Sequence, residues 1–231
     1  ISANPYTKEI HVNADTGLDT NPGTYALPLK TLTQAASVCT ASCVIILHAG
    51  VYTQSVTIAQ SDVSIQALSS NKNTVYIQAT LTLDQSTTSS LVVSGIKIDK
   101  LIAQNQSTVL VHECEVLELD KTSSGRVLFI DSLLQNATAV SITGAGEVSF
   151  KQSTVSNITI NNAAAQVNVF GCENISNTIV TSGALTVDAS VLKSTTALAA
   201  VTGLQPSTLK ITNSTVYDQN NALGKVVALG N

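Results

Sequence analysis

Short alternating segments recur along this chain at a nearly constant spacing. Each segment places apolar residues two positions apart and a further inward position three residues later. Alternation with a period of two indicates β-strands, and segments that start 18 to 24 residues apart fall in the range of solenoid repeats. We therefore expect coils wound around one axis. The segments are LVVSGIKI from Leu91, VLVHECEV from Val109, VLFIDSLL from Val127, VSFKQSTV from Val148, VNVFGCEN from Val167, LTVDASVL from Leu185 and LKITNSTV from Leu209.

The second inward position of each segment holds a mostly small residue, as a sharp bend would require. We expect these residues to form one interior stack. A sandwich of two sheets is the alternative, but its turn signals would recur every 8 to 12 residues or so. Within the stack, Cys114 and Cys172 would lie three coils apart, about 14 Å at the usual strand spacing, so both should remain free thiols. The stack comprises Ile96, Cys114, Ser132, Ser153, Cys172, Ser190 and Ser214.

The N-terminal third has a different pattern. Residues 28–39 place Leu29, Leu32, Ala36 and Cys39 at helical spacing, with a proline at the start. The prediction is a single β-helix domain, 1–231, in which residues 10–43 form an N-terminal loop and capping helix and residues 44–231 form the coils. The helix would cover the open end of the strands. Cys39 and Cys43 could form a disulfide, or could pack as two thiols.

The composition argues against two classes of partner. A net charge of -4 and a single arginine, Arg126, leave no basic surface for nucleic acid. No apolar run approaches the roughly 18 residues of a membrane helix, so membrane insertion is not expected. Because the sequence begins at Ile1 with no initiator Met, we expect a mature product or a fragment.

The opening of the chain resembles that of the pectin-lyase-like superfamily. The matching elements are DTGLDTNPGT, PLKTLTQAAS, CVIILHAGVY and QSVTI, over residues 10–58. The resemblance implies an all-β, right-handed, single-stranded parallel β-helix with an N-terminal capping helix. It implies no particular activity, because this superfamily includes lyases, hydrolases, esterases, phage tail spikes, viral surface proteins and adhesins.

The motifs of the enzymes on this fold are incomplete here. A pectate-lyase-like site would need a basic pair that includes arginine, and Arg126 stands alone; Gln54 lies where the esterase opening usually has Glu. The weak catalytic candidates are Glu113 and Asp131, in the same register one coil apart, about 4.8 Å, which resembles the carboxylate spacing of a retaining glycosidase. Asp99, Glu115, Glu118 and Asp120 lie nearby. The alternative interpretation of all six is a solvated acidic face.

Two further sets of polar residues have open interpretations. Asp15, Asp19 and Asn21 are weak candidates for a Ca²⁺ site, although an ordinary turn would use the same residues. The three histidines, His11, His48 and His112, are far apart in sequence, so we predict a structural role for each. Sequons start at Asn105, Asn136, Asn157, Asn174 and Asn213, of which Asn136 and Asn157 could instead belong to an asparagine ladder.

The absence of complete catalytic motifs favours a structural or receptor-binding β-helix, such as a virion spike or fibre component or an adhesin, at an extracellular or virion surface. No cofactor is required, apart from the Ca²⁺ candidate. The last segment, KVVALGN, is strand-like and has no capping helix, so we expect other chains of an assembly, such as a homotrimer, to cover it. The alternative is a polysaccharide lyase or glycoside hydrolase acting on a host surface glycan.

Overall fold

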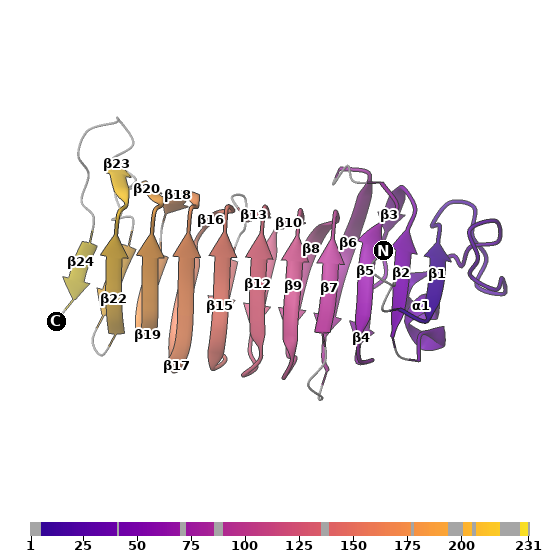
Figure 1. The fold of residues 1–231 in the computed structure, drawn as a ribbon, viewed down its shortest axis with the longest axis horizontal. Coiled ribbons are helices and arrows are strands. Elements are labelled where there is room, and N and C mark those ends of the chain that lie inside the picture. Colours follow the sequence, from indigo (N-terminus) through magenta and orange to yellow (C-terminus); the bar gives the residue numbers. More distant parts are fainter. Residues whose placement is uncertain are drawn as a thin grey trace.

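The computed structural model describes residues 6–40, 42–69, 73–85, 90–134, 139–176, 178–193, 201–204, 207–217 and 227–230. It is an all-β solenoid of about 8 turns in which all strand pairs are parallel, and its strands stack along one long axis (Figure 1). The predicted right-handed parallel β-helix is confirmed. Among the described residues, no helix has the length and apolarity needed to cross a membrane.

Each turn contributes strands to three faces, which we call A, B and C in chain order. Face A consists of β1 (Lys8–Val12), β2 (Cys43–Leu47), β5 (Val63–Ala67), β7 (Ser90–Ser94), β9 (Thr108–His112), β12 (Arg126–Ile130), β15 (Gly146–Lys151), the second parts of β17 (Ile158–Phe170) and β19 (Thr178–Asp188), and β22 (Ser207–Thr212).

Face B consists of β3 (Gly50–Tyr52), the first parts of β6 (Val75–Leu83) and β8 (Lys97–Ala103), β10 (Glu115–Val116), β13 (Leu133–Leu134), β16 (Thr154–Ser156), β18 (Glu173–Ser176), β20 (Val191–Lys193) and β23 (Thr215–Tyr217). Face C consists of β4 (Val56–Ile58), the second parts of β6 and β8, β11 (Glu118–Lys121), β14 (Ala139–Ile142), the first parts of β17 and β19, β21 (Val201–Leu204) and β24 (Val227–Gly230).

The core lies inside the three faces and consists of columns of like side chains. Alternation along each strand turns every second residue inward, so Val109 and Val111 of β9 are fully buried. Parallel pairing then places each inward residue beside its equivalent one coil away: Phe129 pairs with Phe150, and their rings stack with centroids 5.0 Å apart. Small and β-branched residues suffice for this core because each one packs on a neighbour of similar shape.

The corner between faces A and B has the same backbone conformation in successive coils. One residue there takes a positive φ, between 46° and 72°, and the next residue points inward. Glycine adopts such angles without strain, and short polar side chains tolerate them better than most others. The corner residues are Gly95, Glu113, Asp131, Gln152, Gly171, Ala189 and Asn213.

The residues that follow these corners are the seven of the expected interior stack. From Ile96 to Ser190 they are buried, and Ser214 is partly exposed. The serine hydroxyls link neighbouring coils: Ser132 Oγ donates to Ile130 O at 2.9 Å and accepts the N–H of Cys114 at 3.3 Å. Ser153, Ser190 and Ser214 likewise donate to the carbonyl two residues earlier and accept an N–H from the preceding coil. Each hydroxyl therefore satisfies a corner N–H that would otherwise be buried without a partner.

The N-terminal end has a shorter helix than predicted, and one more strand. Helix α1 (Leu32–Val38) begins after residue 28 because Thr31 is its N-cap, with Oγ1 accepting the N–H of Gln34 at 3.1 Å. Leu29 lies outside the helix and forms a bridge with Val12. Strand β1 precedes α1 and pairs with β2, so the sheet starts before residue 44, the expected first residue of the coils.

Candidate functional site

A group of charged side chains lies on the outside of faces B and C around β8. The outward positions of β6, β8, β10 and β11 bring these residues together. The sequence predicted the four acidic ones only as neighbours of Glu113, and it did not predict a site for the tyrosine and the two lysines. We call this group the β8–β11 surface. It consists of Tyr76, Lys97, Asp99, Lys100, Glu115, Glu118 and Asp120.

Pairing between adjacent coils sets the contacts of this surface. Lys97 pairs with Glu115, and its Nζ lies 3.3 Å from Glu115 Oε1. The same ammonium lies 5.3 Å from the centroid of the Tyr76 ring, within reach of a cation–π interaction. The Tyr76 hydroxyl donates to Asp99 Oδ1, and this hydrogen bond raises the pKa of Tyr76. The aromatic ring is thus held by charged groups on two sides.

On face C, one lysine binds two carboxylates. Lys100 Nζ lies 2.6 Å from Glu118 Oε1 and 2.7 Å from Asp120 Oδ2. The hydrogen bonds to Asp120 and then Glu118 raise the pKa of Lys100, so its ammonium stays protonated at neutral pH. About a third of each of these side chains is exposed, which leaves their outer edges open to a ligand.

A local density of charge marks this surface in the sequence. Eight Lys, Asp and Glu residues lie from Lys97 to Lys121, in a chain with only 11 basic and 15 acidic residues. That density could have pointed to Lys97 and Lys100. It could not identify the partners, because these depend on which residues lie side by side in successive coils.

The acidic pair proposed from sequence lies at the corner between faces A and B. Glu113 and Asp131 are both positive-φ corner residues in adjacent coils, and their side chains are 45% and 48% exposed. His112 lies beside both, with Nε2 3.7 Å from Asp131 Oδ2 and 4.0 Å from Glu113 Oε1. The structure therefore adds a histidine to the pair, and places the pair on an exposed ridge.

The Asp15 loop uses its oxygens within the protein. Asp19 Oδ1 accepts the N–H groups of Lys30 and Thr31 at 3.0 and 2.9 Å, and Oδ2 accepts from Thr31 Oγ1 at 2.9 Å. Asn21 Nδ2 donates to Pro28 O at 2.9 Å. These contacts fit the turn interpretation, because Asp19 and Asn21 hold the entrance to α1. Within the described ranges, no three His, Cys, Asp or Glu side chains form a metal-binding group.

Two of the three histidines meet, although they are distant in sequence. His11 Nδ1 lies 3.1 Å from His48 Nε2, and His11 Nε2 lies 2.6 Å from Glu9 Oε1. The Tyr25 ring packs against both imidazoles, with centroids 5.3 and 5.4 Å away. Burial, and then the neighbouring His11, lower the pKa of His48. This cluster ties β1 to the loop after β2 and to the loop before α1.

The cysteines have two different environments. Cys39 and Cys43 form a disulfide, with Cα atoms 6.0 Å apart, between the end of α1 and the start of β2. Cys114 and Cys172 are free and buried. Burial raises the pKa of Cys114 to about 12, and also raises the pKa of Cys172, so both are unreactive thiols.

The interior also holds polar groups at the corner between faces C and A. Lys121 is fully buried, and its ammonium donates to Ser123 O and Ala145 O. Burial lowers the pKa of Lys121 to about 8. Asn105 is fully buried as well, and its Nδ2 donates to Ser107 O at 2.6 Å, so this sequon does not mark a surface site in the folded protein.

Of the four remaining sequons, the structure describes the asparagine side chains of two. Asn157 takes a positive φ, and Asn213 is an exposed corner residue whose Nδ2 donates to Asp188 at 3.0 Å. Asn136 and the side chain of Asn174 lie outside the described residues, and with Asn136 so does the proposed ladder.

Comparison with known proteins adds evidence about the fold. No family model matches the chain, and no curated protein matches it. A crystal structure of a pectate lyase aligns with a TM-score of 0.58 and 12% identity, over 98% of this chain and 78% of that one. The pectin methylesterase from Aspergillus niger aligns with the same TM-score and identity, over 96% of this chain and 89% of that one. Structural similarity at this low sequence identity is evidence for a shared fold and not for a shared function. The chain shares the parallel β-helix fold of these two enzymes.

Proposed function

We propose that this protein is a non-catalytic β-helix that binds a neutral polysaccharide on the β8–β11 surface. The observation that carries the proposal is the set of ion pairs there: Glu115 holds Lys97 beside the ring of Tyr76, and Glu118 and Asp120 hold Lys100. Carboxylates and ammonium groups accept from and donate to sugar hydroxyls, and an aromatic ring supplies an apolar platform next to them.

The charge of this surface favours a neutral ligand. Four carboxylates, of Asp99, Glu115, Glu118 and Asp120, face two ammonium groups, of Lys97 and Lys100. The excess negative charge repels a polyuronide. Polyuronides should therefore be poorer ligands for this surface than uncharged polysaccharides.

The ion pairs also argue for binding over acid–base catalysis. A general base or acid must exchange a proton during the reaction. Glu118 and Asp120 both bind Lys100, whose pKa they raise. Both carboxylates are engaged by the same ammonium group, which suits a preformed binding surface.

The proposed setting is the surface of a virion or a cell, where the β-helix would be a structural and receptor-binding element. The proposal includes contacts with other protein chains, such as a homotrimer, at the last coil near β24. Size-exclusion chromatography with light scattering tests that part, and a monomer at all concentrations would contradict it.

Affinity electrophoresis in gels that contain polysaccharide tests the binding. The expected result is retardation by galactomannan, xyloglucan or mannan, and none by polygalacturonate or alginate. Tyr76→Ala and Lys100→Met should each weaken binding about tenfold, which corresponds to the roughly 1.4 kcal/mol expected of one good contact. Glu173→Gln is the matched control, because Glu173 is exposed on face B in β18, away from this surface. Equal retardation of all four proteins would refute the assignment.

A second candidate function is a polysaccharide lyase or glycoside hydrolase that uses Glu113 and Asp131. The observation in its favour is the imidazole of His112 beside both carboxylates. Reducing-sugar assays and the ultraviolet absorbance of unsaturated products, measured on the same panel, distinguish this function from binding. Activity that is abolished by Glu113→Gln with Asp131→Asn would replace our proposal, whereas activity that survives both changes would exclude this pair as its site.

A further inference from the structure

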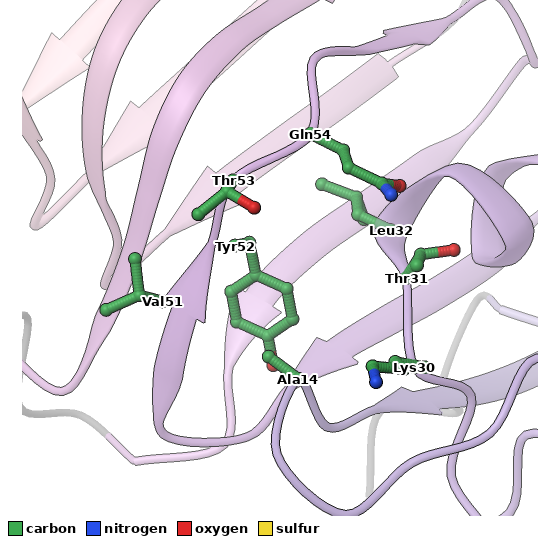
Figure 2. A pocket seen from close by; sticks show the side chains of 8 residues that line it. All are labelled: Ala14, Lys30, Thr31, Leu32, Val51, Tyr52, Thr53 and Gln54. Carbon is green, nitrogen blue, oxygen red and sulfur yellow. The ribbon is translucent and has the colours of Figure 1, made fainter.

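A small pocket lies at the N-terminal end of face B, between the start of α1 and β3. Its volume is about 120 Å³. Figure 2 shows the Tyr52 ring among the lining side chains, with Lys30, Thr31 and Gln54 on one side and Val51 on the other. Pockets for whole ligands start at about 300 Å³. This one therefore has room for one chemical group of a larger molecule.

The buried side of the pocket is apolar and held in place. Leu32 and Tyr52 are buried. The Tyr52 hydroxyl lies 2.9 Å from Val12 O and 2.8 Å from His48 O, to which it donates. These carbonyls occupy the hydroxyl, so Tyr52 contributes its ring to the pocket wall. A methyl group is the kind of group that such a wall accepts.

The outer side of the pocket carries polar groups that the protein itself does not use. The side chains of Lys30, Thr53 and Gln54 are exposed, and none has a hydrogen-bond or ion-pair partner among the residues that the structure describes. Asp19 contacts Lys30 through the backbone N–H rather than through the ammonium. The rim thus offers an ammonium, a hydroxyl and a carboxamide, which can donate to a carbonyl and accept from an amide N–H.

The pocket is continuous with the β8–β11 surface. Val51, which lines the pocket, pairs with Tyr76, and Tyr76 pairs with Lys97. These outward side chains form one column along the solenoid axis, with steps of about 4.8 Å. A chain bound over Lys97 and Tyr76 and running along this axis would reach the pocket within a few sugar units.

We propose that this pocket binds the N-acetyl group of an amino sugar in the bound glycan. The methyl group would contact Leu32 and the Tyr52 ring, the carbonyl would accept from Lys30 or Gln54, and the amide N–H would donate to Thr53 or Gln54. The inference rests on the proposed glycan binding and predicts that, among neutral glycans, those that contain N-acetylhexosamine bind most tightly.

The test uses the full chain and monosaccharides, so that it does not depend on the β8–β11 surface. N-acetylglucosamine and N-acetylgalactosamine should shift the NMR signals of Leu32, Thr53 and Gln54, whereas glucose and galactose should not. Lys30→Met with Gln54→Ala should weaken the response at least tenfold. Lys151→Met is the matched control, because Lys151 is exposed on face A.

The outcomes separate this inference from the proposed function. Shifts caused equally by glucose, or a response unchanged in the Lys30 and Gln54 variant, would overturn the N-acetyl assignment. Shifts caused by sodium acetate at lower concentrations than by N-acetylglucosamine would identify a carboxylate site instead, and would also overturn it. An N-acetyl response that persists in Tyr76→Ala, while polysaccharide binding is weakened, supports both proposals. Such a response without any polysaccharide binding supports the pocket and contradicts the proposed function.

Discussion

The N-terminal end and the regular coils of this β-helix have the same parallel pairing but are stabilised in different ways. In the coils from β9 to β22, serine hydroxyls make the same hydrogen bond at one corner after another. At the N-terminal end, the contacts are single ones: the disulfide, the Asp19 bonds, the Tyr52 hydroxyl and the His11–His48 pair. A strand within the stack forms backbone hydrogen bonds with a coil on either side. A strand at the end lacks one of these neighbours, so individual contacts hold it in place.

The largest expected effect on stability comes from Lys121, a charged residue at an inward position where the neighbouring coils have apolar residues. Lys121 occupies an inward position between Ala103 and Ile142 in the neighbouring coils. Burial lowers its pKa from 10.5 to about 8, so the unfolded chain binds the proton more tightly than the folded protein does. The free energy of unfolding should therefore rise as the pH increases from about 8 towards 10.5.

Lys121→Met should remove this penalty. At pH 7 the variant should gain up to about 3 kcal/mol in the free energy of unfolding, measured by urea denaturation, and should lack the rise at alkaline pH. Lys151→Met, at an exposed position, is the control. A variant that is less stable than the parent at pH 7 would mean that the bonds from Lys121 to two carbonyls outweigh the cost of its burial.

The second prediction concerns the disulfide of the N-terminal end. Cys39→Ala with Cys43→Ala should lower the free energy of unfolding by about 2 kcal/mol, as expected for a short loop. The loss should appear first at α1 and β2 in hydrogen exchange. Cys114→Ser should have a much smaller effect, because serine already fills this place in other coils. Equal loss of protection in all coils would show that the end and the coils form one cooperative unit.

The third prediction concerns the repeated hydroxyl. Ser132→Ala leaves the N–H of Cys114 without its acceptor and should cost about 1 to 2 kcal/mol. Ser132→Cys should cost less, because Cys114 and Cys172 fill the same position with sulfur near backbone carbonyls. Thermal unfolding of the two variants measures the difference, and equal losses would contradict the role of the hydroxyl.

The smallest expected effect is a pH response of the N-terminal end. The lowered pKa of His48 means that the folded protein favours its neutral form. The unfolded chain therefore binds a proton first as the pH falls below the ordinary histidine value of about 6.5, and stability is lost in that direction. Hydrogen exchange at pH 7 and pH 5 should show faster exchange in β1 and the Tyr25 loop than in β9 or β12. His48→Gln should abolish the difference.

Much of the fold could be predicted from the sequence because a solenoid repeats its own pattern. The alternation around Val109 and Val127 indicates strands, and the spacing indicates coils. The start of α1 was harder to place, because Asp19 fixes it through a contact with Thr31 from a distant loop. Strand β1 was missed, since its pairing with β2 spans the whole helix and loop between them.

The candidate sites were less predictable. The sequence places Glu113 and Asp131 in the same register. It does not show that both are corner residues with positive φ, because this depends on the backbone conformation. The contacts of Lys100 with Glu118 and Asp120 cross from one coil to the next, as does the contact of His11 with His48. The number of residues between two positions does not predict whether their side chains meet, because the loops between strands differ in length.

The sequence by itself determined the period of the coils and the identity of the inward residues. Only the tertiary structure decided which outward polar groups meet, that Asn105 and Lys121 are buried, and that a pocket with unused donors lies beside α1. The physical reason is that inward residues follow from alternation along one strand, whereas outward neighbours depend on the register between coils, which the loops and corners set together.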